Sequence, residues 1–438
     1  MPTAKILYQN ILWRGLFYFS AFLLNILIAR HFKAAESGSI YFIINIFTLA
    51  HLLCSLSIDS GIIYFVSKKE LDPSRLLSFS ILWTILTGLV LMAVLPAFIT
   101  VSFNNISRTE LAVYCIFFIC GNLLFNFCAG LFYAQSNFVI PNIISLSFNM
   151  MLLLCLPYNE SSLLPGITDN NYFYFYFASF PAQALVITIA YYWLSIKKFT
   201  FKLPAIIELK KLLKYSLFAL AGNAAFFLLY RIDYWFVEKY CTTAALGNYI
   251  QVSKLGQLFF ILPSILATAI FPLTASDSKN NFPHWLALLS RFFLFFYAGC
   301  CLVLVLSGYW LFPFVFGKSF SSMYIAFIFL IPGILSLSAL FTLTAYNGGK
   351  NKLKANMKGC LLALIVVLAG NWILVPEYGI NAAAAVSSIG YIVYEIYLLY
   401  DFKKENDIKL SSFFIFRFED ITTLKKLLLT TKTKHNGI

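Results

Sequence analysis

Charge is scarce in this sequence of 438 residues: only 11% of them are Asp, Glu, Lys or Arg, whereas 61% are hydrophobic. A soluble domain carries about 25% charged residues, because its surface must face water. The mean hydropathy of +0.81 agrees with this shortage of charge. The composition therefore excludes a sizeable soluble domain and predicts that most of the chain lies in lipid.

Several catalytic and cofactor motifs are also missing. No glycine-rich loop ending in Lys-Ser or Lys-Thr is present, so the sequence does not support direct use of ATP. The nine cysteines lack the paired spacing of a metal or redox site. The longest expected outer loop, 157–171, offers only Glu160 and Asp169 for chemistry. We therefore expect no metal, no cofactor and no enzymatic activity.

Twelve apolar stretches are each long enough to cross a bilayer as a tilted helix. They do not alternate with a period of two residues, as strands of a membrane barrel would. The sequence thus predicts an all-α polytopic membrane protein with about 12 transmembrane helices. The stretches cover residues 11–30, 39–66, 76–100, 110–134, 137–156, 173–195, 212–237, 244–273, 286–312, 322–346, 355–375 and 379–400.

The basic residues predict the orientation of the chain. With a cytoplasmic N-terminus, 24 of the 32 Lys and Arg residues fall on the cytoplasmic side, five fall outside, and three lie within spans. This asymmetry follows the positive-inside rule. Both termini are therefore expected in the cytoplasm. Because the cations are spread over alternate loops, most of the net charge of +14 reports topology and does not predict binding of nucleic acid.

The basic loop near residue 200 divides the spans into two sets of six. We expect an N-terminal lobe over 1–200, a C-terminal lobe over 201–400 and a basic cytoplasmic tail over 401–438. The beginnings of the two sets are weakly similar, since each has a short charged loop followed by glycine and tyrosine (Gly38 and Tyr41; Gly247 and Tyr249). Repeated six-helix halves are typical of transporters. Residues 411–429 of the tail predict either an interfacial amphipathic helix or a disordered segment.

The second half carries a recognisable pattern. Its parts are Arg231-Ile232-Asp233, Gly247-Asn248-Tyr249, Lys254-Leu255, Pro263 and Phe271-Pro272. This pattern and the start of the first half resemble the bacterial polysaccharide transporter family, the O-antigen or lipid-linked-oligosaccharide flippases. The resemblance implies the fold of the multidrug/oligosaccharidyl-lipid/polysaccharide exporter superfamily, with two six-helix lobes around a central cavity. It also implies movement of an undecaprenyl-diphosphate-linked oligosaccharide from the cytoplasmic to the outer leaflet, as in lipopolysaccharide and other polysaccharide biosynthesis. The resemblance thus places the protein in the bacterial cytoplasmic (inner) membrane.

Polar side chains inside the spans are the candidate site, because such residues are costly in lipid. The second span has the longest polar stripe, which covers about 120° of a helix at 100° per residue. This stripe could line a wet cavity or form hydrogen bonds between helices. Its members are Tyr41, Asn45, Thr48, His51, Ser55 and Asp59.

Smaller polar faces occur on other spans. Asn122 and Asn126 share one face of the fourth span, and Asn142 and Asn149 share one face of the fifth. Their amides suit sugar hydroxyls, and they equally suit contacts between helices. In the second half, Gln251, Lys254 and Gln257 lie on the eighth span. Arg231 and Asp233 end the seventh span about 200° apart, so they cannot pair along one helix face.

The cations inside the spans suggest how an anionic substrate would be bound. We expect Lys254, with Arg14 or Arg231, to attract the diphosphate, because paired cations offset its desolvation. The sugar would contact amides. The proton-coupling candidates are His51, Asp59 and Asp233. The substrate-binding candidates are Lys254, Arg231, Arg14, Gln251, Gln257, Asn122, Asn126, Asn149 and Asn45.

Two other functions compete with this hypothesis. A multidrug or cation exporter of the same superfamily is the main alternative, although cationic drugs favour acidic cavities and the buried charge here is mainly basic. A membrane-embedded sugar polymerase would need reactive residues on an outer loop. The expected partners are the lipid-linked oligosaccharide, membrane lipid and other membrane proteins of polysaccharide assembly.

Overall fold

The computed structural model describes residues 2–98, 107–157, 167–195, 201–260, 282–350, 352–406 and 409–415. All regular structure in these ranges is helical. Large apolar side chains lie exposed on the outside of the helices, as shown by Leu89 of α3 (58% exposed) and Leu306 of α11 (68%). Eight helices are long and apolar enough to cross a membrane. The prediction of an all-α polytopic membrane protein is therefore confirmed.

The chain divides into two compact units. Unit 1 comprises Met1–Phe227 with Val315–Gly317, and unit 2 comprises Leu228–Phe314 with Lys318–Ile438. Unit 1 contains α1 (Pro2–Ser55), α2 (Ile58–Ser67), α3 (Pro73–Phe98), α4 (Arg108–Ala134), α5 (Val139–Cys155), α6 (Asp169–Ser195) and most of α7 (Ile206–Arg231). The chain thus passes from one unit to the other inside α7.

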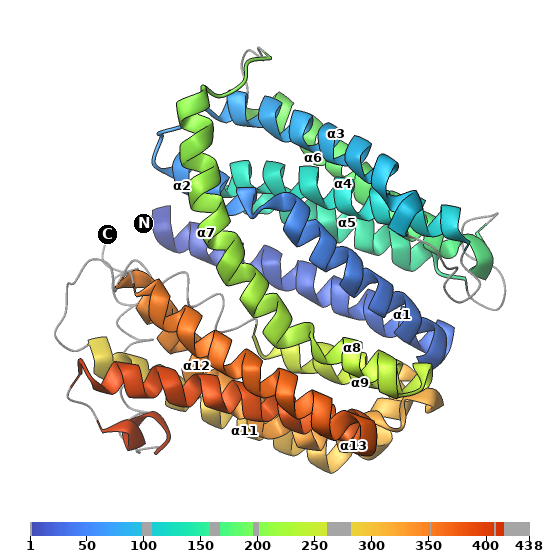
Figure 1. Ribbon diagram of the computed structural model, residues 1–438, viewed down its shortest axis with the longest axis vertical. Helices are drawn as coiled ribbons and strands as arrows, with labels where there is room; N and C mark the ends of the chain where they lie inside the picture. Colours follow the sequence, from blue (N-terminus) through green and yellow to red (C-terminus); the bar gives the residue numbers. More distant parts are fainter. Residues whose placement is uncertain are drawn as a thin grey trace. The chain divides into compact units, whose positions relative to one another are not determined.

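The first helix of unit 1 is a hairpin of two helical arms. Lys33 has φ 59° and ψ 177°, so the helix reverses direction there. Tyr41 lies eight residues after this turn and Asn25 lies eight residues before the turn. The Tyr41 hydroxyl donates to the carbonyl of Asn25 at 3.3 Å. The two arms therefore lie side by side, as Figure 1 shows. They correspond to the first two predicted spans.

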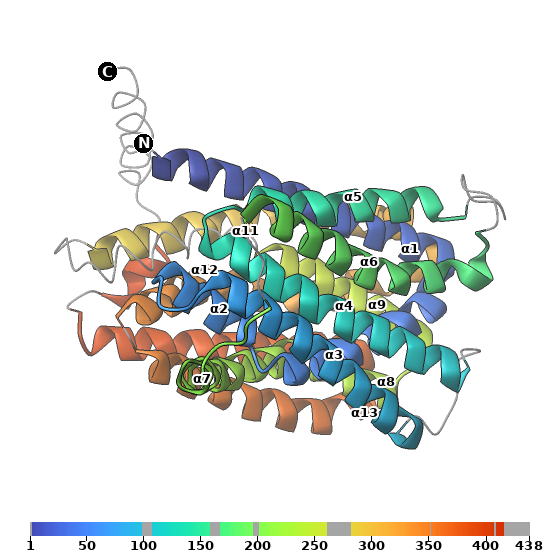
Figure 2. The same cartoon turned by 90° about the horizontal axis from the view of Figure 1, so that it is seen from above.

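Aromatic packing holds the centre of unit 1 together. Phe47 of α1 contacts Phe118 of α4 and Phe177 of α6, with ring centroids about 6 Å apart. Tyr114 stacks on Phe177 at 4.6 Å. Figure 2 shows α5 beside the first arm of α1 and α4 near α6. Packed aromatic pairs of this kind fix helices with little help from polar contacts.

Unit 2 contains α8 (Asp233–Tyr240), α9 (Thr243–Leu258), α11 (Phe282–Phe316), α12 (Met323–Gly349) and α13 (Leu353–Lys403), with the short 3₁₀ helices η1 (Lys318–Phe320) and η2 (Leu410–Phe413). α13 is a second hairpin, because Gly379 has φ 61° and ψ −140°. A Cβ on Gly370, before the turn, would lie 2.8 Å from a methyl group of Val386, after it. α12 packs along this hairpin.

Every predicted span has a helical counterpart among the described residues, although residues 261–273 of the eighth span lie outside them. α1 and α13 each supply two spans, and α7 with α8 supplies the seventh. One expectation needs correction: the second span is not one continuous helix. Leu56 and Ser57 have φ of 47° and 52°, so the helix breaks there and α2 begins at Ile58.

Candidate functional site: polar groups inside the helical units

The break at Leu56 and Ser57 changes the interpretation of the polar stripe on the second span. Asp59 lies in the first turn of α2, beyond the break, so helical angles counted from Asn45 do not apply to it. Thr48 donates to the carbonyl of Ile44 in its own helix, at 2.6 Å. Tyr41 and Ser55 are buried in unit 1. Much of the stripe therefore makes helix contacts, which is the second of the two alternatives for it.

Asn45 is a predicted substrate-binding residue that lies enclosed in unit 1. It is only 3% exposed, and neither its amide nitrogen nor its amide oxygen has a hydrogen-bond partner among the described residues. A buried amide without partners costs about 1–3 kcal/mol. In this conformation Asn45 lies inside unit 1, where a large substrate has no access.

His51 and Asn126 come together from α1 and α4. The Nε2 atom of His51 lies 3.4 Å from Nδ2 of Asn126, and both residues are half-buried. The structure thus brings a predicted proton-coupling residue next to a predicted sugar-binding residue of the same unit.

The other amides of unit 1 differ in what they bind. The side chains of Asn122 and Asn142 donate to carbonyls one turn earlier in their own helices, at 2.8 and 2.6 Å. Asn149 instead donates to the hydroxyl of Ser20 at 2.9 Å, which ties α5 to α1. Of these three residues, Asn149 is therefore the one whose amide connects two helices in the described contacts.

Arg14 lies over an aromatic ring of α4. Its guanidinium carbon is 5.8 Å from the ring centroid of Tyr133, a cation–π distance. Tyr133 stacks in turn on Phe138 at 5.3 Å. Because Arg14 is half-buried and has a neutral neighbour, its charge remains available to an anion.

In unit 2, Arg231 is the centre of a hydrogen-bond network. Its guanidinium donates to Oε1 of Gln257 at 2.7 Å and to the hydroxyl of Tyr234 at 3.0 Å. Gln257 then donates to the hydroxyl of Ser253 at 3.2 Å. Both described hydrogen-bond acceptors of Arg231 are neutral, and the Asp233 carboxylate is close enough for its charge to interact with that of the arginine.

Lys254 lies next to this network on α9. It is half-buried and close enough to Arg231 for the two charges to interact. Gln251, one turn away, is 1% exposed. The structure thus brings together Arg231, Lys254 and Gln257, as the sequence predicts, and buries Gln251 beside them.

Asp233 has different partners. It is 1% exposed, and its carboxylate accepts hydrogen bonds from the hydroxyls of Tyr249 and Ser387, the second at 2.9 Å. The backbone N–H of Tyr234 donates to its other oxygen at 2.9 Å. No ion pair between Asp233 and Arg231 occurs among the described residues, although their charges are close enough to interact. The sequence did not indicate the two hydroxyl donors, because they come from separate helices.

Two buried ionisable residues were not predicted as site residues. Glu395 of α13 is 5% exposed, and its only sequence signal is that it is the sole acidic residue in the last predicted span. Arg291 of α11 is 7% exposed and donates to the carbonyl of Ser412 at 2.5 Å. That contact holds η2 against unit 2, and Phe413 of η2 is fully buried. Of the tail segment 411–429, residues 416–429 lie outside the described residues.

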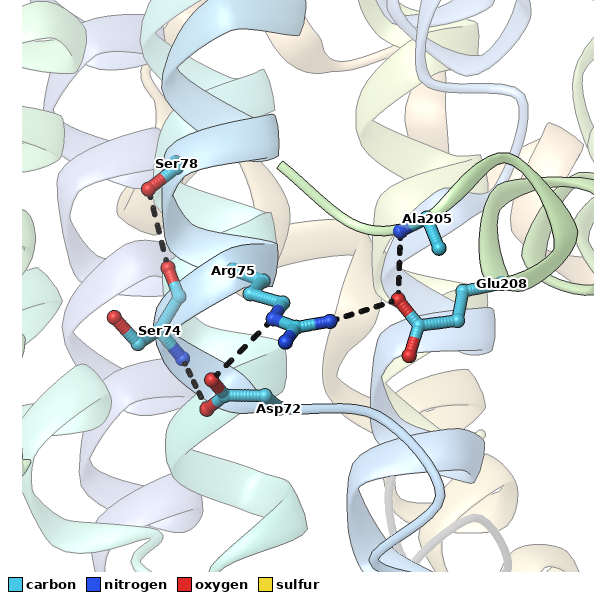
Figure 3. Close-up of polar contacts among 6 residues, drawn as sticks. All are labelled: Asp72, Ser74, Arg75, Ser78, Ala205 and Glu208. Atoms are coloured by element: carbon cyan, nitrogen blue, oxygen red, sulfur yellow. Dashed lines mark hydrogen bonds and ion pairs between the residues drawn. The ribbon is translucent and has the colours of Figure 1, made fainter. Parts of the chain in front are cut away.

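A pocket of about 580 Å³ lies in unit 1 where α2, α3, α4 and α7 end or begin. Arg75 on its wall contacts Glu208 at 3.4 Å and Asp72 at 3.9 Å, as Figure 3 shows. Glu208 also accepts from the backbone N–H of Ala205 at 2.7 Å, next to the start of α7. The pocket is lined by charges of both signs.

A separate contact lies at the end of α2. The Tyr64 hydroxyl accepts a hydrogen bond from exposed Lys68 and thereby raises the pKa of that ammonium.

Comparison with known proteins identifies the fold. No family model matches the sequence, and no curated protein sequence matches it. Among solved structures, a lipid II flippase, MurJ, in an inward closed conformation matches with a TM-score of 0.66 and 16% identity, over 98% of this chain and 93% of that chain. The chain has the fold of the MOP transporter superfamily.

Two further structures of that superfamily match equally well. An outward-facing multidrug resistance MATE family transporter has a TM-score of 0.65 and 14% identity, over 91% of this chain and 95% of that one. A MOP superfamily transporter from Pyrococcus furiosus, described as having a binding pocket of reversed polarity, has a TM-score of 0.65 and 13% identity, over 92% and 94% of the two chains. The similar structures include both a flippase and an exporter, so the fold is compatible with either substrate class.

Proposed function

We propose that this protein is a flippase that moves an undecaprenyl-diphosphate-linked oligosaccharide from the cytoplasmic to the outer leaflet of the bacterial inner membrane. The observation that carries the proposal is the pair of neighbouring cations in unit 2, Arg231 on α7 and Lys254 on α9. The described hydrogen bonds of Arg231 go to neutral acceptors, and the two cations outnumber the one carboxylate, Asp233, that interacts with the charge of Arg231. A diphosphate needs such charges to leave water.

Unit 1 supplies groups that suit a sugar. The half-buried amides of Asn122, Asn126 and Asn149 can both donate to and accept from hydroxyl groups. Arg14 adds a cation in the same unit. We propose 1–200 and 201–400 as the functional halves, which expose these residues alternately to the two leaflets, and 401–438 as a cytoplasmic tail.

The fold agrees with this proposal because one similar structure is a lipid II flippase. Among ionisable groups, we propose His51, Asp59 and Asp233 as candidates for proton coupling, because each is a titratable side chain inside a helical unit. Other membrane proteins of polysaccharide assembly are proposed partners, since the lipid-linked substrate must be made on one face and used on the other.

Replacement of Lys254 tests the cationic site. We expect Lys254→Gln to slow flipping of undecaprenyl-diphosphate-linked oligosaccharide at least tenfold, because a hydrogen bond to a charged group contributes about 1.5–3 kcal/mol. Lys254→Arg should keep most of the rate. The measurement is exposure of the sugar on the far side of proteoliposomes that contain equal amounts of protein.

Lys358→Gln is the matched control, because Lys358 is an exposed cation on α13 of the same unit. It removes one positive charge without touching the Arg231 network, and its flipping rate should equal that of the wild type. A Lys254→Gln protein that flips the substrate at the wild-type rate would rule out a role of Lys254 in binding the diphosphate.

A further inference from the structure

Glu395 is a carboxyl group buried in the second arm of α13 without a visible partner. It is 5% exposed, and its Oε1 atom has no hydrogen-bond donor among the described residues. Lys403, the last residue of the helix, is eight residues away, so Glu395 lies roughly 12 Å along the helix axis from that end. This depth places it well inside the apolar part of the helix.

The helix faces show which element covers Glu395. Ser388 and Tyr391 face α12, because a Cβ on Gly333 of α12 would lie 2.7 Å from the Cα of Ser388 and 3.0 Å from the ring of Tyr391. Ser388 also donates to the carbonyl of Phe329 at 2.7 Å. Seven residues later, Glu395 lies only about 20° from Ser388 around the helix axis. It is therefore on the side of α13 that packs against α12.

α12 brings no charge to this contact, since none of its residues, Met323–Gly349, is acidic, basic or histidine. The α12 residues that follow Gly333 on its buried side are Ser336, Leu337 and Leu340. Both leucines are at most 1% exposed, and the Ser336 hydroxyl donates to the carbonyl of Gly333 in its own helix at 2.8 Å. Glu395 therefore lies on a packed helix contact without charged groups.

The other elements in contact with α13 are α8 and α9, the end of α7, whose Tyr230 ring lies 5.0 Å from that of Tyr391, and η2, whose Phe413 ring lies 5.5 Å from that of Phe402. The nearby charged residues of these helices are Arg231 at the end of α7, Lys254 on α9, and Asp233, Glu238 and Lys239 on α8. In the first arm of α13, Lys354 and Lys358 are exposed. None of these residues has an ion pair or hydrogen bond with Glu395 in the described structure. The remaining titratable side chains around this part of α13 are phenols and one thiol, which are neutral at neutral pH: Tyr230, Tyr346, Cys360, Tyr391, Tyr394 and Tyr397.

An ionised carboxylate in such surroundings would pay a large desolvation cost, whereas a protonated carboxyl would not. We propose that Glu395 is a proton-binding site of unit 2. It holds a proton while α12 and α13 are packed as they are here, and releases it when their separation admits water. This assignment rests on the proposed transport function, because the released proton supplies the coupling to substrate movement.

A substrate-free measurement tests the protonation itself. Infrared spectra of the purified full-length protein at neutral pH should show a carbonyl band of a protonated carboxylic acid. Glu395→Gln should remove that band, and the substitution should be tolerated because glutamine has the shape of the neutral acid. Glu377→Gln, at an exposed position in the first arm of the same helix, should leave the band unchanged. Equal spectra for the wild type and Glu395→Gln would overturn the proposal.

A transport measurement tests the coupling. In proteoliposomes, a proton gradient should accelerate the wild type and Glu377→Gln alike, whereas Glu395→Gln should lose at least tenfold of that stimulation. A Glu395→Gln protein with the full response to the gradient would overturn the coupling role. The infrared result does not depend on the substrate, so the proton site is tested even if the protein moves something other than a lipid-linked oligosaccharide.

Discussion

At the scale of single residues, the two buried carboxyl groups of unit 2 differ in how they are satisfied. Asp233 accepts hydrogen bonds from Tyr249, Ser387 and the backbone of Tyr234, whereas Oε1 of Glu395 has no donor among the described residues. The first arrangement is built to hold a charge, and the second tolerates only a neutral acid. The two carboxyl groups therefore suit different tasks within one unit.

The hydroxyl of Tyr249 should matter for stability because it serves a buried carboxylate. We expect Tyr249→Phe to lower the free energy of unfolding by about 1–3 kcal/mol, since the substitution removes a donor to a charged group. The measurement is the thermal midpoint in detergent. Tyr324→Phe is the control, because the Tyr324 hydroxyl donates to a neutral carbonyl, that of Val305, at 2.9 Å. Equal losses in the two variants would contradict a charged Asp233.

The sequence shows which polar and charged residues lie within the predicted spans, but it predicts only in part which of their side chains face one another. Helical spacing places Lys254 and Gln257 on one span, whereas only the structure shows that Arg231 of another helix lies beside them. Glu395 was missed because a lone acidic residue near a helix end could also face the membrane surface. Only the packing of α12 shows that it is buried.

At the scale of elements, each unit has a helical hairpin that turns at one residue with positive φ. The residue is Lys33 in α1, with φ 59°, and Gly379 in α13, with φ 61°. Glycine adopts such a conformation freely, whereas lysine is strained there. The sequence predicted the two helices on each side of these turns from their apolar runs. It could not predict the break at Leu56 and Ser57, which has neither glycine nor proline.

The turns predict opposite effects for two substitutions. Lys33→Gly should raise the free energy of unfolding by about 1 kcal/mol, because it relieves backbone strain. Gly379→Ala should lower it by about 1–3 kcal/mol through the backbone alone, since the new Cβ would lie no closer than 3.7 Å to its nearest neighbour, Cys241. Thermal midpoints in detergent test both. A destabilised Lys33→Gly protein would show that this turn is not strained.

At the scale of the whole molecule, the few charged residues have two predicted roles, membrane orientation and substrate binding. Of the 32 basic residues, 24 are predicted on the cytoplasmic side, where they predict orientation, and three are predicted within the spans. The fold is shared by a lipid II flippase and a multidrug transporter, so the fold alone does not choose the substrate. The cations Arg231 and Lys254 favour an anionic substrate over a cationic drug.

The central claim is that this protein moves diphosphate-linked lipids. The direct measurement compares two cargoes in proteoliposomes of the wild-type protein: an undecaprenyl-diphosphate-linked oligosaccharide and a cationic dye. Our account predicts protein-dependent flipping of the lipid-linked oligosaccharide and no protein-dependent movement of the dye. Transport of the dye without flipping of the lipid would contradict the account and identify a cation exporter.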